Sequence, residues 1–507
     1  MVMTPEHKRL SDAREGVHHW RRWGPYLSER QWATVREDTS DHGHSWSAFP
    51  HDQARSRAYR WGEDGLQGWC DRQCRLCFAP ALWNGQDEIL KERLFGLAGH
   101  EGNHGEDVKE CYFYLDSSPT HSYTKALYKY PQRKFPYTAL LEENQKIGRS
   151  GPELELADMG VFDEGRYFDV TQEVAKRSPE DLLWRITITN RGPVAAPIHV
   201  LPTLWFRNTW SWGEHRDKPR RKPLIRANAN GLTANHETLG KYRFIADCPQ
   251  HAGTTSWLFT DNESHPDVPG GHPHTQYPKD AFHRYLIHGE KNAVSPHQRG
   301  TKAAAHVQAL IPPGASITIR CRLHAAAETH GIDGLDQFDE TFAERIAECD
   351  AFYRELIPAE IPEQEQLISR QGYAGLLWTK QFYHYIIDEW IRGGESQPPS
   401  AERMNGRNSD WHHFHARDIL SMPDKWEYPW FAAWDSAFHM IPFASVDPDF
   451  AKDQLLLLLR EWYMHPNGQL PAYEWNFSDV NPPVHAWAVW RVYKIADPKG
   501  KRDLLFL

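Results

Sequence analysis

The 507-residue chain has no hydrophobic run that approaches the ~20 apolar residues a helix needs to cross a bilayer. Its first residues, MVMTPEHKRLSDAREGVHHW, also lack the apolar core of a secretory signal. The chain has no excess of positive charge: 58 Lys and Arg against 68 Asp and Glu give a net charge of −10. A nucleic-acid-binding protein normally shows a basic footprint. We therefore expect a soluble protein with neither a membrane nor a nucleic acid as partner.

Cysteine is also scarce, and its number is odd. Seven cysteines fit a reducing compartment better than a disulfide framework, so we expect a cytoplasmic location. Cys70, Cys74 and Cys77 form C-x3-C-x2-C, but a usual zinc pattern needs a second pair of ligands, and Cys111 stands alone. Buried free thiols are the simpler interpretation.

Several catalytic fingerprints are missing. No G-x-S-x-G, Walker or dinucleotide-binding motif occurs, so esterase, nucleotide and redox functions find no support, and we expect no cofactor. His412, His413 and His415, with Asp410 and Asp418 nearby, could in principle form the site of a metal-dependent hydrolase. With 29 histidines spread over the chain, chance clustering explains them better, and we expect no metal.

Aromatic residues, by contrast, are abundant: 22 Trp, 20 Tyr and 22 Phe. They are dense in Trp426–Ser445, where Pro429 and Pro442 bracket a segment that reads as a short helix. Clefts that bind sugars use aromatic side chains heavily, although large cores also do.

One carboxylate lies within this aromatic segment. Phe431, Trp434 and Phe438 share one helical face by their spacing of three and four, and Asp435 sits beside that face. No Lys or Arg occurs between residues 426 and 451. Because an unpaired carboxylate among rings is costly unless it is hydrogen-bonded, Asp435 is a candidate acceptor of sugar hydroxyls or a catalytic acid. The alternative is a structural pair with His439 or with a distant Arg.

The first two thirds of the chain show the period of β-strands. An alternating pattern typical of a strand places Leu182, Trp184, Ile186 and Ile188 on one face. The same alternation recurs in Ser316–Leu323, after a Pro-Pro-Gly turn. We predict an antiparallel β-sandwich over residues 1–335 with a loop-rich N-terminal segment held by Arg–carboxylate pairs. Residues 84–97 read as a short surface helix or a capped turn. Two loops interrupt the strands: a basic one at 213–223, and a Pro-, Gly- and His-rich one at 262–278 that could cover a cleft.

Helical periods follow. We predict a linker helix within 336–360 and a long helix over 363–391, with further helices starting near Pro448 and Pro483. Helices separated by long aromatic loops suggest the first part of an (α/α)6 toroid over 361–507. The fold class is thus multidomain, β followed by α.

At this point the chain resembles glycoside hydrolase family 63, in its larger bacterial form similar to mannosyl-oligosaccharide glucosidases. WGPYLSERQW, ARSRAYRWGEDGL, LKERLFGL, EGNHGEDVKE and LPTLWF carry the resemblance in the N-terminal half. In the α part, YPWFAAWDSAFH and NGQLPAYEWNFSDVNPPVHAWA resemble motifs of the mannosylglycerate and glucosylglycerate hydrolases.

The resemblance implies a β-sandwich, a linker and a catalytic toroid with an inverting mechanism. It also implies that Tyr428, Trp434 and Asp435 line a sugar subsite, with Asp435 binding hydroxyls and not serving as the acid. Asn481 replaces a residue that is often Gln in such relatives. The candidate substrate-binding residues are Tyr428, Trp434, Asp435, Phe438, Glu474, Trp475, Asn481 and His485.

Inverting hydrolysis needs two carboxyl groups roughly 6.5–9.5 Å apart. By the resemblance, the general acid and base belong to later motifs, so we expect a fragment that lacks both and no confident catalytic residue within it. The leading hypothesis is an exo-acting inverting α-glucosidase-like hydrolase of an oligosaccharide or small glucoside. The alternative is a non-catalytic carbohydrate-binding protein. In both cases the partner is a carbohydrate, and the sequence does not indicate an oligomeric state.

Overall fold

A computed structural model gives the structure of the chain. It describes all residues except 1–2, 32–48, 98–106, 212–220, 250–255, 269–270, 272–273, 329–330, 332–333, 394–398, 407, 424, 426–431, 471–480 and 498.

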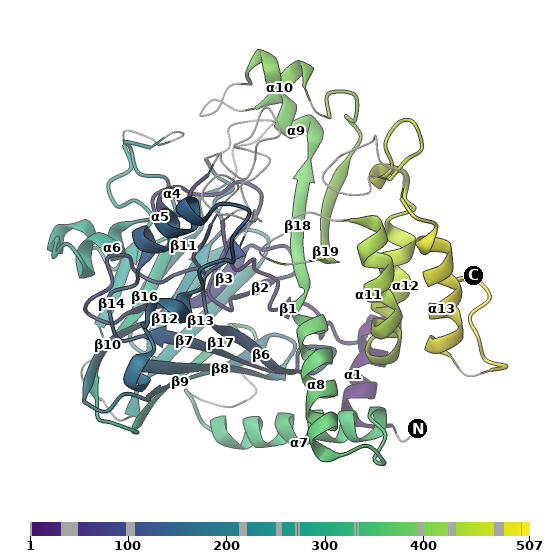
Figure 1. Ribbon diagram of the computed structural model, residues 1–507, viewed down its shortest axis with the longest axis horizontal. Helices are drawn as coiled ribbons and strands as arrows, with labels where there is room; N and C mark the ends of the chain where they lie inside the picture. The colour runs from purple at the N-terminus through teal and green to yellow at the C-terminus, as the bar shows by residue number, and fades with distance from the viewer. Residues whose placement is uncertain are drawn as a thin grey trace.

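Two large antiparallel sheets make up the first two thirds of the chain (Figure 1). The six-stranded sheet has the order β1 (Trp23–Gly24), β2 (Trp69–Asp71), β3 (Leu76–Trp83), β10 (Ala196–Phe206), β16 (Lys302–Ile311), β14 (Ser256–Thr260). The nine-stranded sheet has the order β15 (Arg299–Gly300), β11 (Leu224–Asn228), β12 (Gly231–His236), β13 (Gly240–Asp247), β17 (Ser316–Ala325), β9 (Asp181–Asn190), β8 (Tyr167–Ser178), β7 (Tyr123–Pro131), β6 (Tyr112–Ser117).

The predicted alternation produces the core between these sheets. Trp184 and Ile186 of β9 lie directly opposite Cys321 and Ile319 of β17, and all four are buried. They share one hydrophobic cluster with residues of the six-stranded sheet such as Leu204. Each strand therefore turns one face inward, as the period of two requires.

The N-terminal segment is tied down by ion pairs, as predicted. Helix α1 (Pro5–Arg14) begins at a Thr4 N-cap, and short helix α4 (His51–Ala54) follows later. Buried Arg9 bridges Glu6, at 2.9 Å, and Glu348. Glu6 in turn accepts from Ser122 Oγ at 2.7 Å, next to the start of β7, so the helix is fastened both beside the sheets and, through Glu348, to the helical part.

Residues 84–97 do not form a surface helix, which was one of the two predictions for this segment. The other, a capped turn, is confirmed at its start, where Asn84 Oδ1 accepts from the backbone N–H groups of Gln86 and Asp87 at 2.9 and 2.7 Å. Leu90, Lys91 and Leu94 are buried, and Lys91 Nζ lies 2.6 Å from Glu110 Oε1. The segment meets β3 through an isolated bridge between Lys91 and Leu82 and ends in β4 (Gly96–Leu97), which pairs with β5 (Asp107–Val108). Lys91 and Arg93 pair with buried Glu110 and Asp64, whereas the helix prediction assumed a solvated surface.

Smaller helices decorate the sheets: α5 (Tyr137–Ile147) and α6 (Ala281–Leu286). The predicted helix before the α part is confirmed as α7 (Phe338–Leu356). None of the helices that the structure describes has both the length and the apolar character of a membrane span.

The long helix predicted over 363–391 is interrupted. Helix α8 (Glu363–Trp378) gives way to strand β18 (Lys380–Ile386), which pairs with β19 (His415–Ser421), and helix follows again in α9 (Ile387–Arg392). The sequence FYHYII is rich in aromatic and β-branched residues, which suit a strand once a partner is available. That partner lies beyond α10 (Ala401–Asn405), so local periodicity could not reveal it.

Three packed helices close the chain. Helix α11 (Ala433–Val446) packs on α13 (Val484–Ala496) and on α12 (Pro448–Leu457), and Figure 1 shows all three on the side opposite the sheets, beyond β18 and β19. The predicted starts near Pro448 and Pro483 are confirmed. Pro442, however, lies inside α11 and does not end it; its side chain is exposed, where a missing N–H donor is best tolerated.

Candidate functional site

Asp435 lies in the first turn of α11 and is half-buried. Burial raises its pKa above the usual range, and the hydrogen bond from its own backbone N–H offsets only part of this effect. Within the described ranges no cation pairs with it. The alternative pairing with His439 is also not formed, because the His439 ring bonds Ser421 Oγ at 2.8 Å through Nδ1. Among the described residues, the carboxylate therefore has no side-chain partner.

Aromatic rings flank this carboxylate. Trp434 and Phe438 make an edge-to-face contact with centroids 6.2 Å apart, and Phe438 contacts Trp487 of α13 in the same manner at 5.7 Å. Phe438 and Trp487 are each 45% exposed, so their faces can still receive a sugar ring. Sequence reasoning named Trp434 and Phe438 but missed Trp487. The sequence did contain a signal for it: Trp487 and Trp490 are three residues apart, so they share one face of α13, and both are exposed.

Asn481 and His485 lie at the entry to α13 and hold polar atoms that form no well-formed hydrogen bond with the described residues. Asn481 donates through Nδ2 to the Leu470 carbonyl oxygen at 2.7 Å, but its buried Oδ1 accepts from no described residue. Both ring nitrogens of His485 are likewise buried without a well-formed hydrogen bond to the described chain. Burial lowers the His485 pKa, with a smaller opposing effect from the Leu455 backbone. Such atoms normally find a partner, which a ligand could supply.

Three of the eight predicted residues, Tyr428, Glu474 and Trp475, lie outside the described residues. The structure brings Trp434, Phe438 and Asp435 together on α11 and sets Asn481 and His485 at the entry to α13.

A buried ion-pair cluster holds α11 and α12 in place. Asp447, at the N-cap of α12, accepts from Phe450 N at 3.3 Å, from Lys380 Nζ of β18 at 2.8 Å and from Arg21 of the N-terminal segment. Burial alone would raise the pKa of Asp447, but the charges of Arg21 and Lys380 hold it below the usual range. The helix hairpin that carries Asp435 is thus anchored to distant parts of the chain.

Neither the histidine nor the cysteine cluster forms a metal site within the described chain, which holds no group of three or more His, Cys, Asp or Glu placed to bind an ion. His413 donates through Nε2 to the Met464 carbonyl oxygen at 2.8 Å. Cys70, Cys74 and Cys77 are buried free thiols, as predicted, with Cys74 Sγ 3.7 Å from Cys77 Sγ.

A search of curated proteins finds a relative of the whole chain. The chain is 47% identical over 548 aligned positions to the uncharacterized protein YMR196W of Saccharomyces cerevisiae, covering 99% of this chain and 50% of the relative. The chain therefore spans about half the length of this relative.

Solved structures give weaker matches. They include a putative kojibiose phosphorylase from the human microbiome, with 9% identity, a TM-score of 0.24 and coverage of 64% of this chain and 39% of the other. Another is the family GH92 α-mannosidase BT3965 of Bacteroides thetaiotaomicron, with 10% identity, a TM-score of 0.23 and coverage of 59% and 42%. Likenesses at this level do not define a common fold.

A family model matches the segment that holds the candidate site. Residues 428–506 match the mannosylglycerate hydrolase MGH1-like glycoside hydrolase domain. This is the group whose motifs Trp434, Asp435 and the segment around Asn481 resemble in the sequence, whereas the likeness to family 63 stays a prediction. The part of the chain that carries α11, α12 and α13 is therefore similar to a glycoside hydrolase domain.

Proposed function

We propose that the chain acts on carbohydrate as an exo-acting, α-glucosidase-like glycoside hydrolase, with an oligosaccharide or small glucoside as substrate. The observation that carries this proposal is Asp435: a half-buried carboxylate with a raised pKa, flanked by exposed rings, inside the segment similar to a glycoside hydrolase domain. In this proposal the two sheets form the β-sandwich of such enzymes, and α11–α13 belong to an (α/α)6 toroid.

The arrangement suits a sugar-binding role for each residue. Asp435 accepts hydrogen bonds from ring hydroxyls, which compensate the cost of burying an unpaired carboxylate. Phe438 and Trp487 cover the C–H face of the sugar. Asn481 Oδ1, which accepts from no described residue, and the His485 ring complete the hydrogen bonds to the remaining hydroxyls.

A non-catalytic carbohydrate-binding function is the second candidate. It is favoured by the small number of carboxyl groups beside the exposed rings. Asp435 is the one acidic residue in the sequences of α11 and α13. Glycoside hydrolysis needs two carboxyl groups across the scissile bond. The two functions share the same sugar-contacting residues and differ only in turnover.

The test measures turnover and binding together. The chain is incubated with aryl α-glucosides, glucosylglycerate and mannosylglycerate while released sugar is measured, and the same ligands are titrated calorimetrically. Asp435→Asn should weaken sugar binding about tenfold or more, since hydrogen bonds to a charged group contribute roughly 1.5–3 kcal/mol. Asp449→Asn, a partly buried aspartate on the neighbouring helix α12, is the matched control and should leave binding unchanged. Binding without turnover selects the second candidate, and no binding by the wild type refutes both.

We also propose a cytoplasmic location. It is supported by the cysteines, since all seven are free thiols and six of them are buried.

A further inference from the structure

A small cavity lies on the six-stranded sheet, on the face turned away from the nine-stranded sheet. Ala81 of its wall is followed by Leu82, which belongs to the cluster between the sheets, so the two side chains point to opposite faces. The volume of the cavity is about 20 Å³, and β3, β10 and β16 form part of its wall. Three acidic and three basic side chains with little exposed surface line it: Glu63, Asp64 and Glu92 with Arg93, Lys279 and Lys302. Because these charges cancel, the cavity carries no net charge that would hold an ion.

Four of these charges pair directly. Arg93 Nε lies 2.8 Å from Asp64 Oδ2, and Lys302 Nζ forms an ion pair with Glu92. Burial alone would raise the pKa of Glu92, but the charges of Lys302 and Arg93 hold it at about 2. These two pairs therefore balance their buried charges without a ligand.

Glu63 and Lys279 do not pair directly. Lys279 Nζ donates to the Arg57 carbonyl oxygen at 3.0 Å and lies 3.6 Å from the centroid of the Tyr59 ring. Among the described residues, no carboxylate forms an ion pair with it. An ammonium has three N–H groups, so one N–H is left over after these two contacts. Burial and the neighbouring charge of Arg93 lower the pKa of Lys279 to about 8, as expected for an ammonium without a direct counter-charge.

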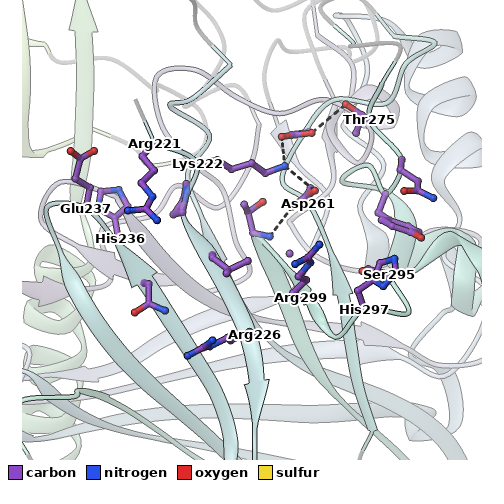
Figure 2. A pocket seen from close by; sticks show the side chains of 18 of the residues that line it. Arg221, Lys222, Arg226, His236, Glu237, Asp261, Thr275, Ser295, His297 and Arg299 are labelled. Carbon is purple, nitrogen blue, oxygen red and sulfur yellow. Dashed lines mark hydrogen bonds and ion pairs between the residues drawn. The ribbon is translucent and has the colours of Figure 1, made fainter. Parts of the chain in front are cut away.

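Asn262 fixes the Glu63 carboxylate and leaves one of its oxygens open. The neighbours of Asn262, which are Asp261 and Glu263, line a larger cavity instead and lie 2.9 and 2.7 Å from Lys222 Nζ; Figure 2 shows the contact with Asp261. Asn262 itself lines the small cavity and donates through Nδ2 to Glu63 Oε1 at 2.7 Å. Glu63 Oε2 has no hydrogen bond to any residue that the structure describes. The small cavity thus meets one open donor, on Lys279, and one open acceptor.

We propose that the cavity holds one ordered water molecule, which accepts a hydrogen bond from Lys279 Nζ and donates one to Glu63 Oε2. A buried water needs roughly 10–15 Å³ and two to four polar partners, and the cavity offers the volume and both kinds of partner. The water turns two separated buried charges into a hydrogen-bonded pair, which lowers the cost of burying them. Asn262 begins the 262–278 loop and Lys279 follows it, so the water also ties both ends of that loop to Glu63. The proposal does not rest on the glycosidase assignment, because it uses none of the residues around Asp435.

The test is a high-resolution crystal structure of the whole chain, repeated after soaks in rubidium and bromide salts. One water should lie within about 2.6–3.2 Å of both Lys279 Nζ and Glu63 Oε2. Neither soak should give an anomalous peak in the cavity, because its charges cancel. A dry cavity, an ion inside it, or Lys279 in direct contact with Glu63 would each overturn the proposal.

A second measurement, in solution, compares Glu63→Gln with Glu92→Gln by urea denaturation. Burial raises the pKa of Glu63 to about 7; the charge of Lys279 opposes the rise, and Cys74 and Asp64 add to it. The folded state therefore keeps a proton on Glu63 that the unfolded state loses above about pH 4.3, so this carboxyl costs stability as pH rises from about 5 to 7. Over this range Glu63→Gln should gain stability relative to wild type, by about tenfold or more in the unfolding constant.

Glu92→Gln is the matched control on the same cavity wall, and it should behave differently. The folded-state pKa of Glu92 is about 2, so Glu92 is ionised in both states between about pH 5 and 7. Glutamine at this position should therefore destabilise the protein by an amount that stays constant over this range. If Glu63→Gln shows the same constant loss, Glu63 has a direct ionic partner, and the water-linked pair is refuted.

Discussion

Asp447 offers the sharpest test of how helices α11 and α12 are held. Its side chain is 0% exposed and joins three parts of the chain: Arg21, Lys380 on β18 and the backbone of Phe450 on α12. Asp447→Ala removes the shared carboxylate and leaves buried Lys380, 2% exposed, without its counter-charge. Breaking a buried pair in this way costs about 3–5 kcal/mol. Loss of an N-cap costs about 0.5–2 kcal/mol more. We expect a loss of roughly 4–6 kcal/mol in the free energy that holds the hairpin closed.

The assay is native-state proteolysis within α11–α13, read alongside urea denaturation at pH 7, since local opening and global unfolding are then separated. Asp449→Ala is the control. Asp449 lies two residues further along and faces Arg14 at a long 3.9 Å, so its loss should cost less than ~1 kcal/mol. A cost below about 2 kcal/mol for Asp447→Ala would refute the reasoning, because a buried cation would then have lost its partner almost freely.

The same cluster predicts a pH dependence with a definite sign. The folded-state pKa of Asp447 lies below its unfolded value. A depressed carboxyl pKa contributes stability that is fully present above the unfolded pKa, near 4, and is lost as pH falls through the folded pKa. The stability difference between wild type and Asp447→Ala should therefore be constant from about pH 5 to 8 and shrink below about pH 4. A difference that grows on acidification would contradict the assignment.

Three further substitutions test other parts of the structure by urea denaturation. Lys176→Met should cost about 3 kcal/mol or more, because the buried ammonium donates to three backbone carbonyl oxygens at 2.6, 2.6 and 2.9 Å, which would lose their donor. Gly300→Ala should destabilise by about 1–3 kcal/mol, because an added Cβ would lie 2.1 Å from the carbonyl oxygen of Thr260 and force the strands apart. Pro442→Ala should stabilise α11 by about 1 kcal/mol or more, because alanine restores a donor inside the helix. Opposite signs would contradict the packing described for each position.

The hydrophobic period of the sequence was enough to predict those helices and strands whose buried face is visible within their own residues. The alternation of Trp184 and Ile186 indicated β9, and the amphipathic run after Phe338 indicated α7, because a buried face leaves its period in the sequence. The hydrophobic period gave the wrong secondary structure where the conformation depends on a partner far away in the sequence. Lys380–Ile386 forms a strand by pairing with His415–Ser421, and residues 84–97 enter the interior, where Lys91 meets Glu110.

The candidate sites divide in the same way. Asp435 could be found from the sequence, because its aromatic neighbours and the absence of nearby Lys or Arg are local facts. Trp487 joins it only through the packing of α13 on α11. In a protein whose buried charges are otherwise densely paired, polar groups without partners stand out against that background. Because pairing is a tertiary property, such groups become visible only once every neighbour is in place, and they are where a ligand gains most by binding.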